Sequence, residues 1–323
     1  MAAVPQAATL RFGSLRGRLL SPRQLYTDEV ALVFGAEVLP RSTDRADSDR
    51  FDLTIEDDPS DGDSVSGLLQ PGGMRLGGAD RCPTVTTEVL RAELSLDSTP
   101  IRIRLAVREP GISRFELRVH FAVVLNKILF LMDHVVLHAA AVRLHDRVHL
   151  FVGEKGAGKS TICLGLARAG GTVLGEDHVI LRRSNPGFLV SGGDERSRLT
   201  EQTERYFFPE LLAIPARDFA GTPKKEIRMG DFFSSRPYED FPAHRLLFPR
   251  VSGRFDLRPL KAQPALLRLM KYTAQFQRFA GAADQGRFLD MVAAFIATVD
   301  PFEVELSHDL SDLERLSDAL ANV

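Results

Sequence analysis

Cysteine is scarce in this sequence. Cys82 and Cys163 are the only cysteines among 323 residues, and neither belongs to a CxxC motif or a Cys/His cluster. A disulfide framework and a zinc site both require paired or clustered cysteines, so the sequence argues against both classes. A reducing, cytoplasmic environment is the expected location.

An excess of charge of either sign is also missing. The 41 lysines and arginines nearly balance the 43 aspartates and glutamates, which leaves a formal net charge of -2. No overall field therefore draws the chain to nucleic acid or to an anionic lipid surface. A small molecule or another protein is the expected partner.

No long apolar run is free of polar groups. The most apolar tract, residues 121–142, is interrupted by Asn126, Lys127, Asp133, His134 and His138. A membrane span would bury these groups at a high cost in free energy, so the tract predicts a buried helix followed by a strand. The first thirty residues lack the apolar run and small-residue cleavage site of a signal peptide, and no secretion signal is expected.

The N-terminal third has the pattern of a small β-rich module. Residues 8–37 predict short strands or turns, and residues 90–107 predict two strands joined by the turn Asp-Ser-Thr-Pro. Between them, residues 41–64 place nine carboxylates around one apolar triplet. Because the ordered ligand pattern of an EF-hand is missing, this run predicts a solvated loop beside a short strand and no calcium site.

A change of periodicity marks the expected domain boundary. Pro110 and Gly111 are followed by apolar residues at helical spacing. We therefore expect the β-rich module over residues 1–110 and a second domain over residues 111–323.

The sequence of the second domain predicts a hairpin near the start of the domain and helices near its end. Residues 137–152 form two apolar runs linked by a tight turn. Residues 188–264 are rich in Pro, Gly and Arg with short strand-like pieces. Residues 265–277 and 286–299 have the spacing of amphipathic helices, and residues 303–323 predict a strand, an Asp or Ser N-cap and a closing helix.

A phosphate-binding loop is the clearest motif. The stretch GEKGAGKST matches G-x-x-x-x-G-K-[ST] in full, and it has the required context of an apolar strand before it and a helix after it. The glycines let backbone N–H groups surround phosphates, Lys159 reaches the β- and γ-phosphates, and the Ser160 hydroxyl ligates Mg²⁺. The residues expected to bind ATP are Gly153, Glu154, Lys155, Gly156, Ala157, Gly158, Lys159, Ser160 and Thr161.

An acidic pair follows the loop at short range. After the helix, Gly170 and Gly171 break the chain, a short strand follows, and Glu176 and Asp177 come next. Sixteen residues separate Ser160 from Asp177, so we expect the acids at the end of the strand next to the loop strand, with a carboxylate close to the γ-phosphate. A carboxylate there accepts the proton of an attacking hydroxyl, orients it, or holds Mg²⁺ through water. The alternative, a surface turn that caps a strand, stays open.

A transporter or motor ATPase is disfavoured. Such a protein would place its second acid much farther along the chain, behind an apolar strand. Residues 191–194, Ser-Gly-Gly-Asp, echo the transporter signature LSGGQ, but no apolar strand ending in Asp-Glu follows them.

Residues 137–181 resemble the catalytic core of the HPr kinase/phosphorylase family in their order of a His, a small-residue strand, a hairpin, the phosphate loop, one helix and the acidic pair. The resemblance implies an α/β (α+β) core on the fold of ATP-dependent phosphoenolpyruvate carboxykinase, with ATP and Mg²⁺ as cofactors. It implies Asp177 as the general base, Lys159 as the phosphate ligand and His138 as an active-site histidine. Ser160 and Glu176 would take the magnesium positions. The bacterial family assembles as rings, so a homo-oligomer is one alternative, and the oligomeric state of this chain stays open.

The chain departs from this family in three respects. Its acidic pair is Glu-Asp where the family usually has Asp-Asp. A Gly-rich segment with a magnesium-binding Glu has no convincing match, since Glu195 and Glu201 lie in that region without a motif. This puts the reverse, phosphorolytic activity in doubt. The N-terminal module is unlike the family's regulatory domain, so HPr itself is not the expected substrate.

Several side chains have a simpler alternative interpretation. His138 lies beside three alanines and would also fit a buried core position. The basic residues of a second turn, Lys224, Lys225 and Arg228, are interpreted as exposed rather than as ligands of phosphate or acceptor. A spaced basic series is interpreted as solvated surface, and it consists of Arg245, Arg250, Arg254 and Arg258.

The sequence as a whole predicts a kinase that transfers the γ-phosphate of ATP to a hydroxyl of a protein, peptide or small molecule. Two alternatives stay open. A shikimate-kinase-like enzyme also carries an acidic pair one helix and one strand after its loop, and a strand over residues 138–144 antiparallel to the loop's own strand would argue against it. A nucleotide-sensing or inactive kinase-like module is the other alternative, because the second glutamate motif is missing.

Overall fold

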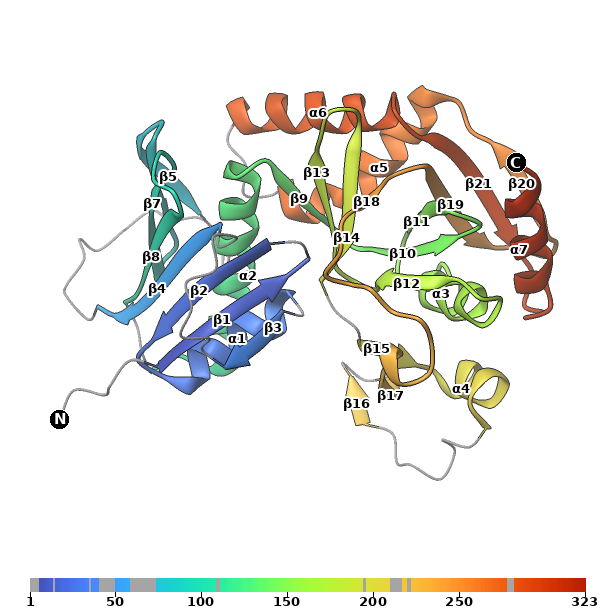
Figure 1. The fold of residues 1–323 in the computed structure, drawn as a ribbon, viewed down its shortest axis with the longest axis horizontal. Helices are drawn as coiled ribbons and strands as arrows, with labels where there is room; N and C mark the ends of the chain where they lie inside the picture. The colour runs from blue at the N-terminus through green and yellow to red at the C-terminus, as the bar shows by residue number, and fades with distance from the viewer. Residues whose placement is uncertain are drawn as a thin grey trace. The chain divides into compact units, whose positions relative to one another are not determined.

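The computed structural model is a mixed α/β protein with several sheets (Figure 1). It describes residues 6–13, 15–34, 36–40, 50–58, 74–108, 111–193, 196–209, 217–219, 222–277 and 282–323. The chain forms two compact units. The first comprises Met1–Val136 and Phe276–Gln285, and the second comprises Leu137–Gln275 and Gly286–Val323.

The first unit is an eight-stranded sheet with two helices. Its elements are β1 (Gln6–Phe12), β2 (Leu15–Ser21), α1 (Gln24–Phe34), β3 (Glu37–Pro40), β4 (Phe51–Asp57), β5 (Arg75–Ala79), β6 (Cys82–Thr86), β7 (Leu90–Ser95), β8 (Ile101–Val107) and α2 (Arg114–Leu131). The strand order is β3-β1-β2-β4-β8-β7-β6-β5. The predicted pair β7–β8 is confirmed, because it is antiparallel with Leu90 opposite Val107.

The expectation of only strands or turns over residues 8–37 was wrong, because α1 lies within that range. Tyr26, Val30 and Val33 recur at helical spacing and are buried. Strands β2 and β4 alternate between buried and partly exposed residues, so one face of the sheet is covered and the other is open.

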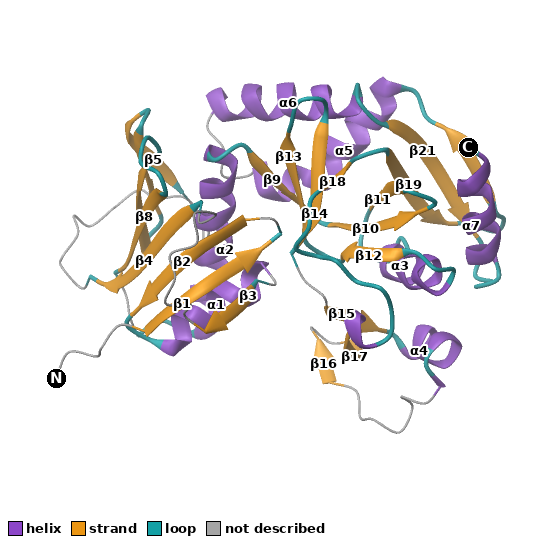
Figure 2. Ribbon diagram, viewed as in Figure 1, coloured by secondary structure: helices purple, strands orange, loops and turns teal. Residues whose placement is uncertain are grey.

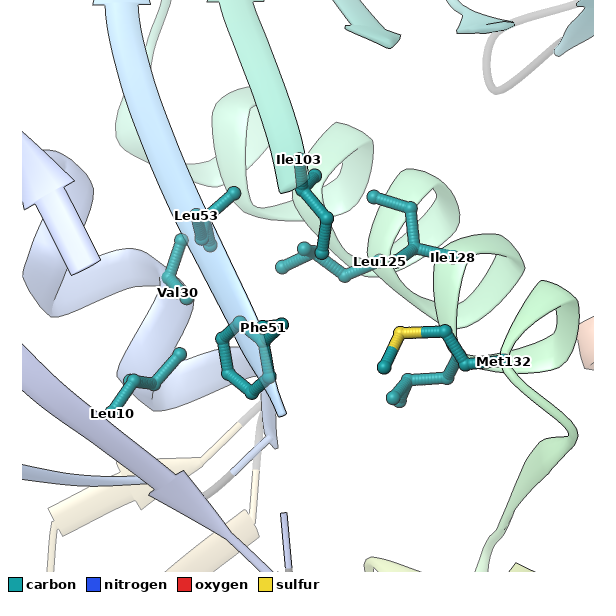
Figure 3. A pocket seen from close by; sticks show the side chains of 9 residues that line it. Leu10, Val30, Phe51, Leu53, Ile103, Leu125, Ile128 and Met132 are labelled. Carbon is teal, nitrogen blue, oxygen red and sulfur yellow. The ribbon is translucent and has the colours of Figure 1, made fainter. Parts of the chain in front are cut away.

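The core of the first unit contains a small gap (Figure 3). Its volume is about 20 Å³, and it is lined by Leu10, Val30, Phe51, Leu53, Ile103, Leu125, Ile128, Leu129 and Met132. A space of this size with a wholly apolar lining offers a water no hydrogen-bond partner. It is a packing defect beneath α1 and α2 and is far too small for a nucleotide.

Helix α2 explains why the compact units divide later than the boundary expected at residue 110. Its residues Leu117, Phe121, Val124 and Ile128 are buried, and α2 contacts α1, β6 and β7 of the first unit. The division falls between Val136 and Leu137. The helix is confirmed as the buried element predicted from the apolar tract.

The second unit contains a six-stranded sheet, and one of its strands leads into the phosphate loop (Figure 2). After β9 (His134–Leu137), its elements begin with β10 (Ala139–Leu144), β11 (Arg147–Val152), α3 (Lys159–Arg168), β12 (Thr172–Gly175), β13 (Val179–Arg183), β14 (Phe188–Gly192), β15 (Arg196–Leu199) and α4 (Glu201–Phe207). They continue with β16 (Arg217–Phe219), β17 (Thr222–Arg228), η2 (Met229–Asp231), β18 (Phe241–Pro242), β19 (Arg245–Val251), β20 (Asp256–Pro259), α5 (Ala262–Gln277), α6 (Ala282–Ile296), β21 (Asp300–Leu306) and α7 (Asp312–Asn322). The end of α5 and the start of α6 belong to the first unit. The large sheet has the order β12-β10-β11-β19-β21-β20.

The predicted hairpin before the phosphate loop is confirmed. Strands β10 and β11 are antiparallel, with Ala139 opposite Val152. His145 and Asp146 connect them with φ values of 51° and 61°, as a two-residue hairpin turn with a left-handed backbone requires. Strand β11 then runs parallel to β19, and β19 runs parallel to β21.

Helices α3 and α7 cover one face of this sheet. The buried cluster contains Ile162 and Leu166 of α3, Leu313 and Leu316 of α7, and apolar residues of β10, β11, β19 and β21 such as Phe151. The predicted C-terminal helices and the strand before the last helix are confirmed. No helix among the described residues is long and apolar enough to cross a membrane.

The spaced arginine series is not simply solvated surface. Arg245 is 1% exposed, and its Nη1 donates to the carbonyl of Leu320 at 2.7 Å, so the surface interpretation was wrong for this residue. The other three arginines remain partly exposed, but they pair with the buried carboxylates of Glu303 and Glu305 on β21. These ion pairs join Arg250 to Glu305, Arg254 to Glu305 and Arg258 to Glu303.

Candidate active site

The phosphate loop connects β11 to the first turn of α3. Gly156 and Gly158 have φ values of 88° and 89°, a backbone conformation that side chains with a Cβ rarely adopt. A Cβ added at either glycine would meet nothing within 4 Å, so the loop is open above these residues. Because α3 begins at Lys159, the unpaired N–H groups of its first turn lie directly after the loop. The loop therefore has the form of an anion cradle.

Lys159 lies inside this loop. Its side chain is buried, and Nζ donates to the carbonyls of Gly153 at 2.9 Å and Glu154 at 3.1 Å. Burial lowers the pKa of Lys159, while the nearby carboxylates of Asp177 and Glu176 raise it. The ammonium is thus held by weak carbonyl acceptors that a phosphate can replace.

The acidic pair forms a tight turn after β12. The N–H of His178 donates to the carbonyl of Glu176 at 2.7 Å, and Asp177 between them has a φ of 63°. A three-residue turn of this kind is uncommon and costs free energy, which makes Asp177 a strained residue. Glu176 is 3% exposed, whereas the Asp177 side chain is 40% exposed. The alternative interpretation of the acidic pair as a surface turn therefore fails for Glu176, because its side chain is buried.

Two glycines bring the turn against a neighbouring strand. A Cβ added to Gly192 would lie 1.7 Å from the carbonyl oxygen of Leu174, and one added to Gly175 would lie 2.6 Å from the Cα of Gly192. The N–H of Gly193 also donates to the carbonyl of His178 at 2.8 Å. The Ser-Gly-Gly run therefore packs against the acidic turn, which gives it a structural role in place of the transporter signature.

Strand β10 lies between β12, which the acidic turn follows, and β11, which leads into the phosphate loop. Strand β12 pairs with β10, and β10 pairs with β11. The acids are therefore not on the strand beside β11. Their charges still act on Lys159, because the carboxylates of Asp177 and Glu176 raise its pKa against the effect of burial.

His138 joins this group from the residue between β9 and β10. Its Nδ1 lies 3.7 Å from Oδ1 of Asp177. Burial lowers the pKa of His138, Lys159 lowers it further, and Asp177 raises it. The His138 side chain is 36% exposed, so it is not the fully buried core residue that was the alternative. The three residues predicted as catalytic, His138, Lys159 and Asp177, thus lie together.

Arg198 is a member of the site that the sequence did not indicate. It lies on β15, where its Nη1 is 3.8 Å from Oδ2 of Asp177 and its Nε is 3.6 Å from Oε2 of Glu226. Glu226 is directly opposite Arg198 on β17. No motif surrounds Arg198, and only the alternation of its strand, Arg-Ser-Arg-Leu, could have placed it on an exposed face.

A buried ion pair fixes β17 beside α4. Lys225 pairs with Glu204, and the two side chains are 8% and 4% exposed. The interpretation of Lys225 as part of an exposed basic turn was therefore wrong, although Arg228 is exposed as expected. Helix α4 in turn contacts the start of α3, where the hydroxyls of Thr203 and Thr161 are 3.5 Å apart.

A second ion pair involves the phosphate loop. Nζ of Lys271 on α5 lies 2.5 Å from Oε1 of Glu154. Both side chains are largely exposed, so this pair contributes little to stability.

Oxygen ligands for a magnesium ion come from few side chains. Ser160 lies in the first turn of α3, and Glu176 and Asp177 supply carboxylates, which are the hard oxygen donors that Mg²⁺ prefers. Among the described residues, no three His, Cys, Asp or Glu side chains cluster closely enough to hold a metal by themselves. Glu195 lies outside the described residues, and Glu201 is exposed and paired with Arg205. The donor set fits a Mg²⁺ that arrives with nucleotide phosphates.

Comparisons with known proteins add little to this geometry. No family model and no curated protein matches the sequence. A solved structure of the HPr(Ser) kinase/phosphatase from Coxiella burnetii aligns over 58% of this chain and 94% of its own, with 11% identity and a TM-score of 0.31. A likeness at this level carries no argument about fold or activity, and the family resemblance stays a prediction.

Proposed function

We propose that this protein is an ATP-dependent kinase that transfers the γ-phosphate to a hydroxyl. The observation that carries the proposal is the meeting of Lys159, His138 and Asp177 beside a phosphate loop with an open, glycine-lined cradle. A cation for phosphate and a carboxylate for the acceptor proton are the parts that phosphoryl transfer requires.

Each residue has a distinct role in the proposed reaction. Lys159 exchanges its two loop carbonyls for phosphate oxygens when ATP binds. Asp177 accepts the proton of the acceptor hydroxyl as that oxygen attacks the γ-phosphorus and the bond to ADP breaks. His138 orients Asp177, and Arg198 lies close enough to stabilise charge on the transferring group. The strained turn presents Asp177 without a rearrangement.

The side chains at this site supply only some of the oxygen ligands that Mg²⁺ needs, and the nucleotide would supply the others. Ser160 and Glu176 would hold the ion together with phosphate oxygens, and the ion would neutralise phosphate charge. The burial of Glu176 suits a carboxylate that is compensated by cations, because an isolated buried carboxylate is costly.

The order of strands supports a carboxykinase-like core over a shikimate-kinase-like one. Strand β10, Ala139–Leu144, is antiparallel to β11 and lies between β11 and β12. An antiparallel strand at this position is the feature expected to distinguish the two kinds of enzyme. The long segment before the loop agrees with the same choice.

The test is γ-phosphate transfer from labelled Mg-ATP in the presence of extract from the native cell. We expect Lys159→Ala and Asp177→Asn to abolish transfer, while the exposed controls Lys261→Ala and Asp290→Asn retain it. Circular dichroism of all variants checks that they fold. Transfer at the wild-type rate in either site variant would refute the assignment, and ATP binding without transfer in the wild type would support a nucleotide sensor.

A further inference from the structure

The first unit has a hollow on the open face of its sheet. Strands β2, β4 and β8 lie side by side there and run parallel to one another (Figure 1). Helices α1 and α2 cover the opposite face, where Phe51 meets Val30 and Leu125 around the small apolar gap. The hollow has a volume of about 260 Å³, which approaches the size of small-molecule sites. The side chains of the open face that line it are Arg18, Leu20, Asp52, Thr54, Arg102 and Arg104.

The strand register places two arginines on either side of one aspartate in this hollow. Arg18 on β2 is opposite Asp52 on β4, and Arg102 on β8 is opposite the same Asp52. Because neighbouring strands are about 4.8 Å apart, the backbones of the two arginines are about 10 Å apart. Both arginine side chains line the hollow, so both can reach a group that lies over Asp52.

Neither arginine pairs with the aspartate beside it. In the described part of the chain, the guanidinium groups of Arg18 and Arg102 make no ion pair and no hydrogen bond, although Asp52 lies on the strand between them. The Nε atom of Arg18 is also shielded from solvent without an acceptor among the described residues. A shielded donor without an acceptor costs free energy. The hollow therefore presents guanidinium donors that are available to a ligand.

Other arginines of the same sheet do pair with neighbouring carboxylates. Arg104, which also lines the hollow, forms ion pairs with Glu56 and Glu93. Arg91 pairs with Glu93 at 2.9 Å. The charge of Arg104 is therefore already compensated, and the two arginines beside Asp52 are the ones that a ligand would use.

We propose that this hollow binds a small molecule that carries a phosphate group. A guanidinium donates two parallel hydrogen bonds to an anion, so one guanidinium occupies both oxygens of a carboxylate, whereas a phosphate has enough oxygens for two guanidinium groups. The Thr54 hydroxyl adds a further donor on the same face of β4, about 6.6 Å along the strand from Asp52. The ligand assigned to the hollow is therefore a phosphate monoester held between Arg18 and Arg102.

The size of the hollow and the charge of Asp52 restrict the ligand further. A volume of about 260 Å³ accommodates a phosphate with a short organic body and is too small for a nucleoside triphosphate. The carboxylate of Asp52 repels a bound anion, so both guanidinium groups are needed to outweigh it. Every side chain of the hollow belongs to the first unit, and the proposal does not depend on the kinase function of the second unit.

Calorimetric titration of the full chain with glycerol 3-phosphate tests the site. All proteins carry Lys159→Ala, which weakens any binding of the probe at the phosphate loop. We expect Arg18→Gln/Arg102→Gln to weaken binding of the probe about tenfold, and Asp52→Asn to strengthen it because a like charge beside the phosphate is removed. The matched control Arg81→Gln/Arg91→Gln removes two exposed arginines of the first unit that do not line the hollow, and it should leave the affinity unchanged. Circular dichroism checks that all variants fold.

Each outcome decides for or against the site. A loss of affinity in the double variant that the control does not show supports it, and so does tighter binding in Asp52→Asn. Equal affinities in the double variant and the control, weaker binding in Asp52→Asn, or no binding of the probe at about 10 mM would overturn it. Succinate that binds as tightly as glycerol 3-phosphate would overturn the choice of phosphate over carboxylate. A phosphoserine peptide that binds about tenfold more tightly than glycerol 3-phosphate would overturn the small molecule in favour of a polypeptide.

Discussion

His149 is a fully buried histidine on β11, the strand that leads into the phosphate loop. Its Nε2 donates to the carbonyl of Leu144 at 3.2 Å, while Nδ1 has no hydrogen-bond partner among the described residues. Burial, together with the nearby charge of Arg245 and against the hydrogen bond to Leu144, lowers the pKa of His149 from 6.5 to about 4. The folded protein therefore keeps this ring neutral under conditions where the unfolded chain protonates it.

The first prediction follows from this difference. Above pH 6.5 both states are neutral and the full stability is present, and between pH 6.5 and about 4 the unfolded state binds the extra proton. The free energy of unfolding should fall across this window by about 3 kcal/mol from His149 alone. Urea unfolding followed by circular dichroism should show a shallower acid dependence in His149→Gln. An identical slope in the variant and the wild type would contradict the shift.

The candidate site shows which functional residues can be identified from the sequence alone. Lys159 and Asp177 were predicted because a loop motif and short spacing restrict where they lie. Arg198 was missed because its role depends on a strand register and on Asp177 meeting it across the fold. The Glu204–Lys225 pair was missed for the same reason, since 21 positions separate its partners.

At the scale of elements, the acidic turn depends on a glycine contact. A Cβ at Gly192 would overlap the carbonyl oxygen of Leu174 in β12, a backbone atom that cannot rotate away. Gly192→Ala should therefore destabilise the fold by about 3 kcal/mol. Gly253→Ala is the matched control, because an added Cβ there meets nothing within 4 Å, and it should change the stability by less than about 0.5 kcal/mol. Comparable urea midpoints for the two variants would refute the contact.

The buried ion pair between α4 and β17 gives a prediction of coupling. Glu204→Gln or Lys225→Met alone leaves one buried charge without its partner, and each should cost about 3–5 kcal/mol of unfolding free energy. The double variant Glu204→Gln/Lys225→Met buries no charge and should be clearly more stable than the sum of the single changes predicts. A double-mutant cycle by urea unfolding measures the coupling. Additive losses would show that the two side chains act independently.

Elements with strong local signals were predicted well. The hairpin over residues 137–152 has two apolar runs and a two-residue turn, and the structure reproduces it. Helix α1 was missed even though Ser21-Pro22-Arg23-Gln24 at its start has the capping-box pattern with Pro directly after the serine, a signal that could have indicated the helix. Pairing order was not accessible either, since the position of β10 between β11 and β12 is set by long-range contacts.

At the scale of the whole molecule, α2 decides where the first unit ends. Its buried residues include Leu117, Phe121 and Ile128, and it contacts β6 and β7. The spacing change at Pro110 marks the start of a helix, and a sequence cannot show which unit that helix packs on. Lys127 of α2 also pairs with Asp284, so the segment Phe276–Gln285 belongs to the same unit.

Fragments test this division. A fragment of residues 1–136 retains α2 over the sheet, and it carries Lys127→Met because it lacks Asp284, the partner of Lys127. A fragment of residues 1–110 exposes the apolar face that α2 covers. We expect cooperative thermal unfolding for the longer fragment and aggregation or non-cooperative unfolding for the shorter one. The comparison uses circular dichroism and size-exclusion chromatography. A well-folded fragment of residues 1–110 would favour the boundary expected from the sequence.

The fate of the γ-phosphate is the most direct test of the central claim. Phosphorus NMR of the full chain with Mg-ATP and native extract distinguishes ADP, inorganic phosphate and phosphomonoesters in one sample. The account predicts that each ADP formed is matched by one phosphomonoester, and that the signal disappears in Asp177→Asn. ADP matched by inorganic phosphate, or ATP that binds and stays intact, would contradict a kinase.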